Sequence, residues 1–340
     1  MGVMISSNAV NGIPCHINKH YITDILKGEL GFKGVVISDF SDVEFLIEAH
    51  EVTMSKREAT KMAVNAGLDM LMNPYDIDVV DYIVEMVENN EISMTRIDDA
   101  VSKILRLKLE LDLFKNPVTD YRNYGNFASN NSKKLAYQSA CESITLLKNK
   151  NSILPIKKGA KILVAGPNGN SMRTLNGAWT YNWQGKHTDL YVKGVPAYLI
   201  NKVTKEGISK NSLISENLSP KNYTTIFESV SNVYGENNVT YVPGVSYKRG
   251  GAFYDMEEDD IDQVVKAAKS HDFILLCLGE NSYTEKPGDL NDLNLHELQI
   301  KLANRLSKCG KPVILVLNIG RPRLKSQFCP CIYLKTIPSL

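Results

Sequence analysis

The chain has 340 residues, of which 43% are apolar and 23% are charged, proportions that exclude a disordered protein and suit two globular domains. Its 39 Lys and Arg residues nearly balance 38 Asp and Glu residues, so the net charge of +1 provides no global field to attract nucleic acid or an anionic membrane. The apolar runs are far shorter than the roughly 20 residues of a membrane helix, and we expect neither kind of partner.

The first segment, residues 1–115, alternates short apolar runs with stretches of helical periodicity. Its predicted helices begin at Asn18, run from Ser55 to Ala66 with a Ser55–Glu58 capping box and Gly67 at the end, and cover residues 77–88 and 93–111. Its predicted strands are residues 3–6, 35–38 and 68–72. Strands that are apolar throughout and separated by helices predict a parallel sheet covered by helices.

The second segment follows a predicted linker, residues 116–132, in which Asn-Pro, Tyr-Gly and Ser-Asn signals gather. The acidic run Glu257–Asp260 is interpreted as negative charge at a helix N-terminus, and the polar stretch from Trp179 to Tyr223 is too long for an idle connection. The predicted strands of this segment, residues 133–322, are residues 162–165, 239–241, 273–278 and 313–317, with a helix before each of the last two.

No metal or cofactor is expected from the residue pattern. The six cysteines are scattered, and the closest two, Cys329 and Cys331, form neither a CxxC pair nor half of a zinc site. Cys277 lies in an apolar strand, where a buried thiol is typical. Residues 164–171 follow a strand but lack both glycine patterns of phosphate-binding turns, so a nucleotide-binding α/β protein is the least favoured hypothesis.

An acidic side chain follows the second predicted strand. Asp39 comes directly after the apolar run of residues 35–38, and a residue at this point of a parallel α/β fold faces the binding crevice. The alternative is a structural role, in which the Asp39 carboxylate caps the next helix through the amides of residues 41 and 42. Position alone leaves both interpretations open.

Three more acids follow the predicted strand 273–278. Glu280, Glu285 and Asp289 stand among turn-forming Gly and Pro residues at the carboxyl end of that strand. Such acids often do no more than keep an exposed loop solvated, and composition favours that interpretation. Family resemblance changes this balance.

Eight stretches of the chain, taken in order, closely resemble glycoside hydrolase family 3, the β-glucosidase and exo-β-glucanase group. Any one stretch is a weak match, whereas the ordered set is a strong one. They are residues 10–14 with Asn18-Lys19, 26–39, 66–70, 96–105, 143–149, 176–185, the Tyr-Thr-Glu-Lys-Pro-Gly-Asp loop at 283–289, and 310–322.

The resemblance implies a retaining mechanism with a covalent glycosyl-enzyme intermediate, in which Asp39 is the nucleophile and Glu285 the acid/base. One carboxylate must be ionised while its partner carries a proton, so their environments must differ. Glu280 is the competing acid and is otherwise expected to bind substrate. Trp183 is similar to the platform for the leaving-group sugar, and Phe40, where many relatives carry Trp, would narrow it. The alternative for Trp183 is an ordinary half-buried tryptophan.

The resemblance also implies the fold. The family's first domain is a (β/α)8 TIM barrel of about 250 residues, so residues 1–115 would supply about three of its eight strands. Residues 133–322 would form a parallel-sheet α/β/α sandwich that is incomplete at its C-terminus, followed by an atypical tail, residues 323–340. The barrel loops that grip the terminal sugar in relatives have no match, and Ser7 stands where many relatives carry Tyr. We therefore expect a chain truncated at both ends.

The favoured hypothesis is hydrolysis of terminal β-D-glucosyl bonds in a small carbohydrate. The alternative is an inactive fragment that at most binds carbohydrate weakly, because lost sugar contacts remove binding energy that is normally spent on the transition state. The first residues show no basic, apolar leader, and the compartment stays open, although family relatives are often secreted, periplasmic or lysosomal.

Overall fold

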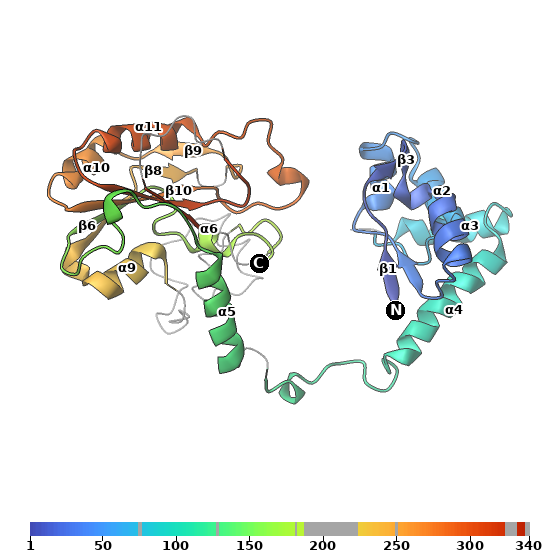
Figure 1. Ribbon diagram of the computed structural model, residues 1–340. Coiled ribbons are helices and arrows are strands. Elements are labelled where there is room, and N and C mark those ends of the chain that lie inside the picture. The colour runs from blue at the N-terminus through green and yellow to red at the C-terminus, as the bar shows by residue number, and fades with distance from the viewer. Residues whose placement is uncertain are drawn as a thin grey trace, which may run out of the picture. The chain divides into compact units, whose positions relative to one another are not determined.

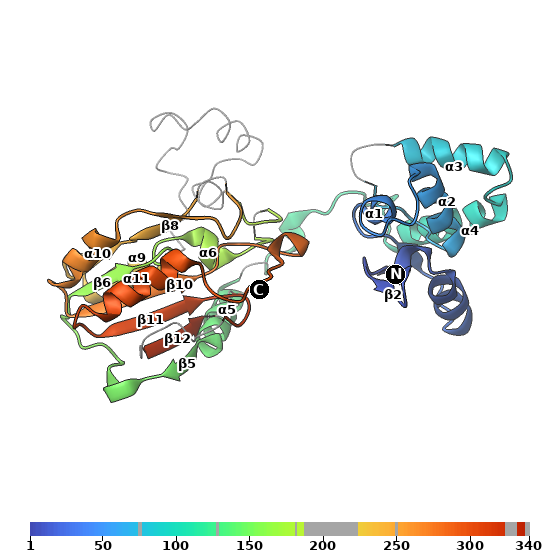
Figure 2. The same ribbon diagram turned by 90° about the horizontal axis from the view of Figure 1, so that it is seen from above.

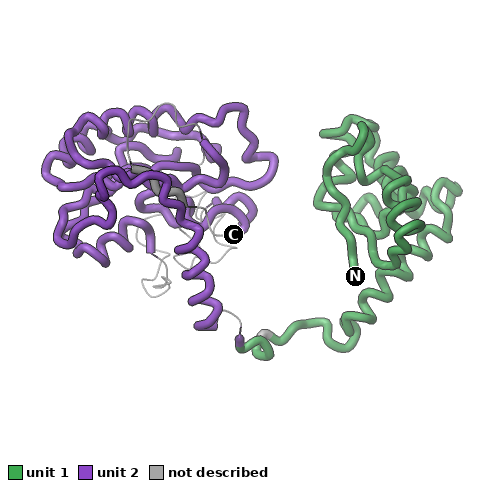
Figure 3. Tube along the Cα trace, viewed as in Figure 1, with its two compact units in different colours: residues 1–125 green, residues 126–340 purple. Residues whose placement is uncertain are grey.

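The computed structural model describes residues 1–73, 77–126, 129–180, 182–186, 224–248, 251–323 and 332–336, the last segment and Tyr121 by their backbone alone. The chain divides into two compact units, Met1–Gly125 and Asn126–Leu340 (Figure 3). Each unit has its own sheet and its own hydrophobic core, and each is considered by itself. None of the helices described combines the length and the hydropathy needed to cross a bilayer.

Unit 1 contains a short parallel sheet in which β1 pairs with β4. β2 and β3 form a separate antiparallel pair. The first predicted strand, residues 3–6, lies one or two residues earlier in the structure, and its ends are exposed rather than buried. The strands of unit 1 are β1 (Gly2–Met4), β2 (Ala9–Val10), β3 (Ile13–Pro14) and β4 (Val35–Ile37).

The third predicted strand of this unit, residues 68–72, is wrong as a strand. Only Met70 makes a parallel bridge, to Ile37 of β4. The carbonyl oxygen of Leu68 instead accepts a hydrogen bond from the guanidinium of Arg96 at 2.7 Å. Because a side chain takes this backbone acceptor, the segment continues as an extended connection beside β4. A TIM barrel therefore stays a prediction.

The four helices predicted in unit 1 are all present, and the prediction missed a fifth, at Asp42–Glu48. The helix expected from Asn18 begins at His20 and has the wider hydrogen-bond pattern of a π-helix, and the Asn18 side chain accepts from the amide of Tyr21. The bounds are His20–Glu29 for the π-helix, α1 (Asp42–Glu48), α2 (Lys56–Ala66), α3 (Asp78–Glu88) and α4 (Met94–Glu110), with 3-10 turns at Cys15–Ile17 and Tyr121–Asn123 (Figure 1).

The caps of α2 are confirmed at both ends, but only half of the capping box forms. Gly67 ends the helix at a φ of 117°, which a side chain would strain. Ser55 accepts from the amide of Glu58, whereas the Glu58 carboxylate contacts Lys61 and the Ser55 amide donates to Thr53. The competing lysine on the same helix explains the difference.

Unit 2 is a six-stranded sheet in the order β5-β12-β11-β10-β6-β7, parallel except for β5. The four strands predicted here are all confirmed. The pattern missed β5 and β12, and β12 lies within the tail expected to be atypical. The bounds are β5 (Thr145–Lys148), β6 (Ile162–Ala165), β7 (Val239–Val242), β10 (Phe273–Gly279), β11 (Val313–Asn318) and β12 (Ile332–Thr336).

Helices cover both faces of this sheet, and Figure 1 shows α9 on the opposite side from α10 and α11. Alternate residues of β10 serve the two cores: Leu276 packs with α10 and α11, and Cys277 packs on the α9 side. Figure 2 shows α11 running along the neighbouring strands. The helices are α5 (Asn130–Ser143), α6 (Met172–Asn176), α9 (Ile226–Tyr234), α10 (Ile261–Ala268) and α11 (Glu297–Ser307), with 3-10 turns at Lys150–Ser152, Glu236–Asn238 and Lys286–Gly288.

The acidic run before α10 has a divided role. Asp260 caps α10 by accepting from the amide of Gln263, as expected of negative charge at a helix start. Glu257 and Glu258 instead belong to β9 (Met256–Glu258), which pairs with β8 (Val245–Tyr247) in an antiparallel hairpin. Most of the irregular stretch between Trp179 and Tyr223, together with Cys329 and Cys331, lies outside the described residues.

Candidate active site

Asp39 lies at the carboxyl end of β4, half-buried, on the loop that leads into α1. Its Oδ1 accepts a hydrogen bond from the amide of Phe40 at 2.6 Å. The residue in the cap position of α1 is Ser41, which has a left-handed backbone and no side-chain cap. The carboxylate thus bonds the amide of its neighbour, not the amides of residues 41 and 42 that the capping alternative requires.

Ser38 fixes the loop that carries Asp39. Its hydroxyl is fully buried, donates to the carbonyl of Asp39 and accepts from the amide of Met72 at 2.7 Å. The amide of Ser41 donates to the Met72 carbonyl. These bonds hold the strand end against the extended segment that follows α2. Phe40 is 50% exposed beside the carboxylate.

A buried polar cluster lies directly behind Asp39. Asp42, in the first turn of α1, is 3% exposed and accepts from the Ser7 hydroxyl at 2.8 Å. His16 is 2% exposed, and its Nε2 lies 3.0 Å from Oδ2 of Asp42. Desolvation lowers the pKa of His16 to about 4 and raises the pKa of Asp42 to about 6. Between these values the pair is neutral, with one proton on Asp42.

The negative charge of Asp39 opposes the lowering of the His16 pKa and adds to the raising of the Asp42 pKa. His50 bonds the Ser7 carbonyl and acts on the same two groups. The sequence pattern did not single out His16 or Asp42, because neither stands at a strand end. Their significance comes from burial beside the candidate nucleophile.

A second buried acid holds unit 1 together. The Asp69 side chain is fully buried and contacts Lys27 of the π-helix at 2.8 Å and Arg96 of α4 at 2.5 Å. It also accepts from the amide of Val36 in β4 at 3.0 Å. One carboxylate therefore ties two helices to the strand that presents Asp39. Burial lowers the pKa of Lys27 to about 8, although Asp69 opposes the shift.

The second candidate loop leaves β10 at Glu280. Both oxygens of this buried carboxylate are occupied: Arg323 and Arg321 contact Oε1, and the Tyr283 hydroxyl and the Gly320 amide donate to Oε2. The Arg321 guanidinium also lies 4.2 Å from the centre of the Tyr283 ring. Glu280 is thus fixed at the root of the loop.

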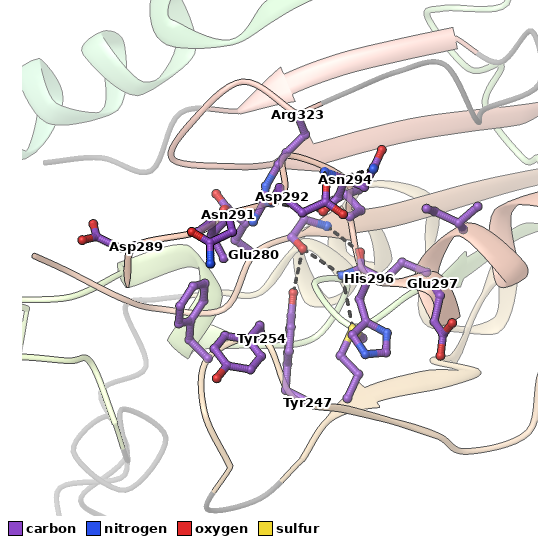
Figure 4. A pocket seen from close by; sticks show the side chains of 17 residues that line it. Tyr247, Tyr254, Glu280, Asp289, Asn291, Asp292, Asn294, His296, Glu297 and Arg323 are labelled. Atoms are coloured by element: carbon purple, nitrogen blue, oxygen red, sulfur yellow. Dashed lines mark hydrogen bonds and ion pairs between the residues drawn. The ribbon is translucent and has the colours of Figure 1, made fainter. Parts of the chain in front are cut away.

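Glu280 borders two cavities. The larger has a volume of about 590 Å³ and contains Tyr247, Tyr254 and Arg323 in its wall (Figure 4). The Tyr247 hydroxyl is committed to the Asn168 side chain and the Gly279 carbonyl. The smaller cavity, about 370 Å³, lies between residues 280–284 and residues 176–180.

Glu285 differs from Glu280 in being exposed, and it meets both tryptophans of the chain. The indole Nε1–H of Trp179 donates to Oε1 at 3.1 Å, and that of Trp183 donates to Oε2 at 3.0 Å. The Glu285 backbone has a φ of 55° and a ψ of −155°, a conformation that residues with a side chain rarely adopt. The family resemblance implied a substrate contact for Trp183, whereas no sequence signal indicated a role for Trp179.

The tryptophan-bearing segment is pinned to the loop that carries Glu285. The Gln184 side chain donates to the Thr284 carbonyl and accepts from the Thr284 amide. The backbone carbonyl of Gln184 accepts from the Ser282 hydroxyl. Gly185 has a φ of 64°, and a Cβ there would lie 2.4 Å from the carbonyl oxygen of Gly177 and 2.7 Å from Cβ of Ser282. Only glycine fits this close approach.

The turn at residues 164–171 has a structural role in this arrangement. Asn168 is fully buried and donates to the carbonyl of Glu280 at 3.1 Å. Gly166 has a φ of 92° and lies so close to Cys277 that a Cβ would meet its carbonyl at 2.2 Å. Across the parts of both units described here, no group of three or more His, Cys, Asp or Glu side chains is arranged to hold a metal.

Comparison with known proteins identifies the lineage. Residues 1–107 match the model of the glycosyl hydrolase family 3 N terminal domain, and residues 144–332 match that of the glycosyl hydrolase family 3 C-terminal domain. The chain belongs to glycosyl hydrolase family 3. The second match continues ten residues beyond Pro322 and reaches the first residue of β12.

Relatives of this chain are named as glycosidases. It is 33% identical over 326 residues to the lysosomal beta glucosidase of Dictyostelium discoideum and 29% identical over 329 residues to a beta-xylosidase of Formosa agariphila. The alignments cover 95% and 94% of this chain but 36% and 40% of those proteins. A beta-glucosidase from Listeria innocua, solved in complex with glucose, superposes with a TM-score of 0.71 at 27% identity over 99% of this chain and 40% of that one. The chain therefore spans about two fifths of their length.

Proposed function

We propose that this chain carries the two catalytic carboxylates of a retaining β-glycosidase that removes terminal β-D-glucosyl residues. The observation that carries the proposal is the placement of Asp39 and Glu285, each on a loop at the carboxyl end of a parallel strand in its own family domain. The carbohydrate class is supported by the glucose bound to the Listeria enzyme.

In the first step the Asp39 carboxylate attacks the anomeric carbon, and the bond from that carbon to the leaving oxygen breaks. Glu285 gives its proton to the departing oxygen. In the second step a water oxygen bonds to the anomeric carbon, its proton passes to Glu285, and the bond to Asp39 breaks.

Glu285 suits the acid/base role better than Glu280. Glu280 has both oxygens committed to arginines, a tyrosine and a backbone amide. The carboxylate of Glu285 is exposed and accepts from the indole N–H groups of Trp179 and Trp183. Trp183 and Phe40, both about half exposed, are proposed to offer apolar faces to sugar C–H groups, and Glu280 to border the substrate site from within the loop.

The test is release of nitrophenol from an aryl β-glucoside by the 340-residue chain. Asp39→Asn is expected to lower the rate at least about 10³-fold, because no other group attacks carbon in its place. Asp81→Asn, an exposed acid on α3, is the matched control and should leave the rate unchanged. Turnover that survives Asp39→Asn would overturn the proposal.

A second candidate function is carbohydrate binding without catalysis, because the chain covers only part of the length of its relatives. A chain matching about two fifths of a glycosidase could bind sugar without turning it over. Glucose binding measured by calorimetry, together with no nitrophenol release, would favour this inactive carbohydrate-binding module. Turnover that is lost in Asp39→Asn would exclude it.

A further inference from the structure

The larger of the two cavities contains a buried hydrogen-bond donor that lacks an acceptor. The side chain of Arg323 is 7% exposed and lines the cavity of about 590 Å³. Its Nη1 donates to the carbonyls of Asp292 and Asn294, and its Nη2 contacts the Glu280 carboxylate. The Nε–H has no partner among the residues that the structure describes. A buried donor without an acceptor costs free energy, so a ligand that supplies an acceptor there would be favoured.

The other buried polar groups of this cavity are already satisfied. The Tyr247 hydroxyl donates to the Gly279 carbonyl, and both oxygens of Glu280 have partners. The Gln299 side chain donates to the Gly279 carbonyl and accepts from the Gly279 amide. Of the buried side-chain nitrogen and oxygen atoms described in this wall, only Nε of Arg323 is without a partner.

The rim of the cavity offers an aromatic ring and several acceptors. Tyr254 is 55% exposed, and its ring meets the buried ring of Phe253 edge-on, with 5.2 Å between the centroids. Asp289, Asn291 and Glu297 are exposed in the same wall. The cavity therefore combines a donor in its interior with carboxylate and amide oxygens and an apolar ring face at its edge.

The charges of the wall decide which ligand class fits. Four carboxylates, those of Glu280, Asp289, Asp292 and Glu297, line the cavity with one guanidinium, so an anion is disfavoured. An ammonium group could not satisfy Nε of Arg323, because both groups only donate. A hydroxyl accepts from an N–H and donates to a carboxylate. The volume lies within the roughly 300–1,000 Å³ of small-molecule sites, and the wall suits a neutral polyhydroxylated molecule.

We propose that this cavity is a sugar-binding site additional to the proposed catalytic one. In it a hydroxyl oxygen of a neutral pyranose accepts from Nε of Arg323, and one face of the sugar ring stacks on Tyr254. Arg323 follows β11 and Tyr254 lies between β8 and β9, so the two residues reach the cavity from different elements (Figure 4). Within the described part of the chain, the wall contains neither Glu285 nor a tryptophan, and the site does not depend on the proposed hydrolysis.

The test observes the Nε–H of Arg323 directly by NMR of the ¹⁵N-labelled chain. Arg323→Lys identifies the signal by its disappearance, since the substituted lysine keeps a cation opposite Glu280 but has no Nε–H. D-glucose is the probe, and we expect it to move this signal in the parent chain, in Asp39→Asn and in Trp183→Ala. Sorbitol has similar hydroxyls but no ring to stack, and it should need a concentration about tenfold higher for the same shift.

The stacking contact is tested by Tyr254→Ala, a change at an exposed ring. We expect it to raise the glucose concentration at half-maximal shift about three- to tenfold. Tyr137→Ala is the matched control, because Tyr137 is an exposed tyrosine of α5, also in unit 2, and lies outside the lining of this cavity. That variant should leave the half-maximal concentration unchanged.

The outcomes separate this site from the proposed hydrolase. An Arg323 signal that glucose leaves unmoved would mean that solvent satisfies the Nε–H, and it would overturn the site whatever the activity of the chain. A shift that is lost in Trp183→Ala but unaffected by Tyr254→Ala would also overturn it. Equal effects of sorbitol and glucose would contradict the pyranose assignment. The expected shift in a chain that releases no nitrophenol would support the site and count against the hydrolase alone.

Discussion

Two glutamates in one loop show how the surroundings of a carboxylate decide what it can do. Glu280 and Glu285 are five positions apart and both follow the apolar strand β10. Glu280 is buried and bound by cations, so a proton transfer there would break the loop's own support. Glu285 is exposed and accepts from two neutral N–H groups. The same residue type is therefore structural at one position and a candidate for chemistry at the other.

The cluster behind Asp39 makes a prediction about pH and stability. Near pH 5 the folded pair holds its single proton on Asp42, whereas in the unfolded chain the single proton is on His16. The number of bound protons is the same, so this pair adds little slope to the free energy of unfolding. Asp42→Asn removes the group that binds the proton in the folded chain. His16 then binds a proton only in the unfolded chain between about pH 4 and pH 6.5.

Unfolding of Asp42→Asn should therefore become harder as pH rises from 4 to 6.5, by up to about 3 kcal/mol relative to the parent chain. Urea titrations followed by circular dichroism at several pH values measure this. The double variant His16→Gln with Asp42→Asn is the control and should restore the flat profile. Parallel pH profiles for Asp42→Asn and the parent chain would contradict the neutral-pair assignment.

At the scale of elements, the Asp69 carboxylate connects the π-helix and α4 to β4, which strand pairing alone does not do. β4 and the segment around Met70 share a single bridge, and the Asp69 carboxylate adds contacts to the π-helix, α4 and the Val36 amide. Asp69→Asn should lower the free energy of unfolding of unit 1 by about 3–5 kcal/mol, because it leaves partly buried cations without their anion. The shift of the urea midpoint in circular dichroism measures the loss.

The matched control is Asp262→Asn, which removes an acid paired with Arg305 on the surface of unit 2. An exposed pair contributes little, so that variant should change stability by less than about 1 kcal/mol. Equal effects of the two substitutions would show that Asp69 does not organise the unit.

The strands show which parts of the fold the sequence predicts and which it does not. Continuous apolar runs predicted β4, β6, β7, β10 and β11, because a strand buried on both faces reads as one apolar block. β5 was missed because its side chains are largely exposed and its partner, β12, is far along the chain. Residues 68–72 were wrongly predicted as a strand because their apolar side chains pack in the core. The Leu68 carbonyl accepts from Arg96 and does not pair with a strand.

The candidate site shows the same limit. Asp39 and Glu285 were predicted from their places after strands and from family motifs. His16, Asp69 and Trp179 were not, because their importance comes from partners that are between 26 and 106 positions away. Local patterns specify which residues end a strand, whereas tertiary packing decides which distant groups they meet.

At the scale of the whole molecule, two family domains are present with separate cores, and the proposed reaction needs one carboxylate from each. We propose that the covalent bond to the sugar forms on Asp39 in unit 1, and that Glu285 in unit 2 donates and accepts the proton.

The covalent glycosyl-enzyme intermediate can be trapped, and the labelled residue can then be identified. A 2-deoxy-2-fluoro-β-glucoside with a good leaving group slows release of the sugar more than its attachment, so the labelled carboxylate can be found by digestion and peptide mass spectrometry. We expect the label on the peptide that contains Asp39, and no label in Asp39→Asn. A sugar found on Glu285, Glu280 or any other carboxylate of the chain would contradict it.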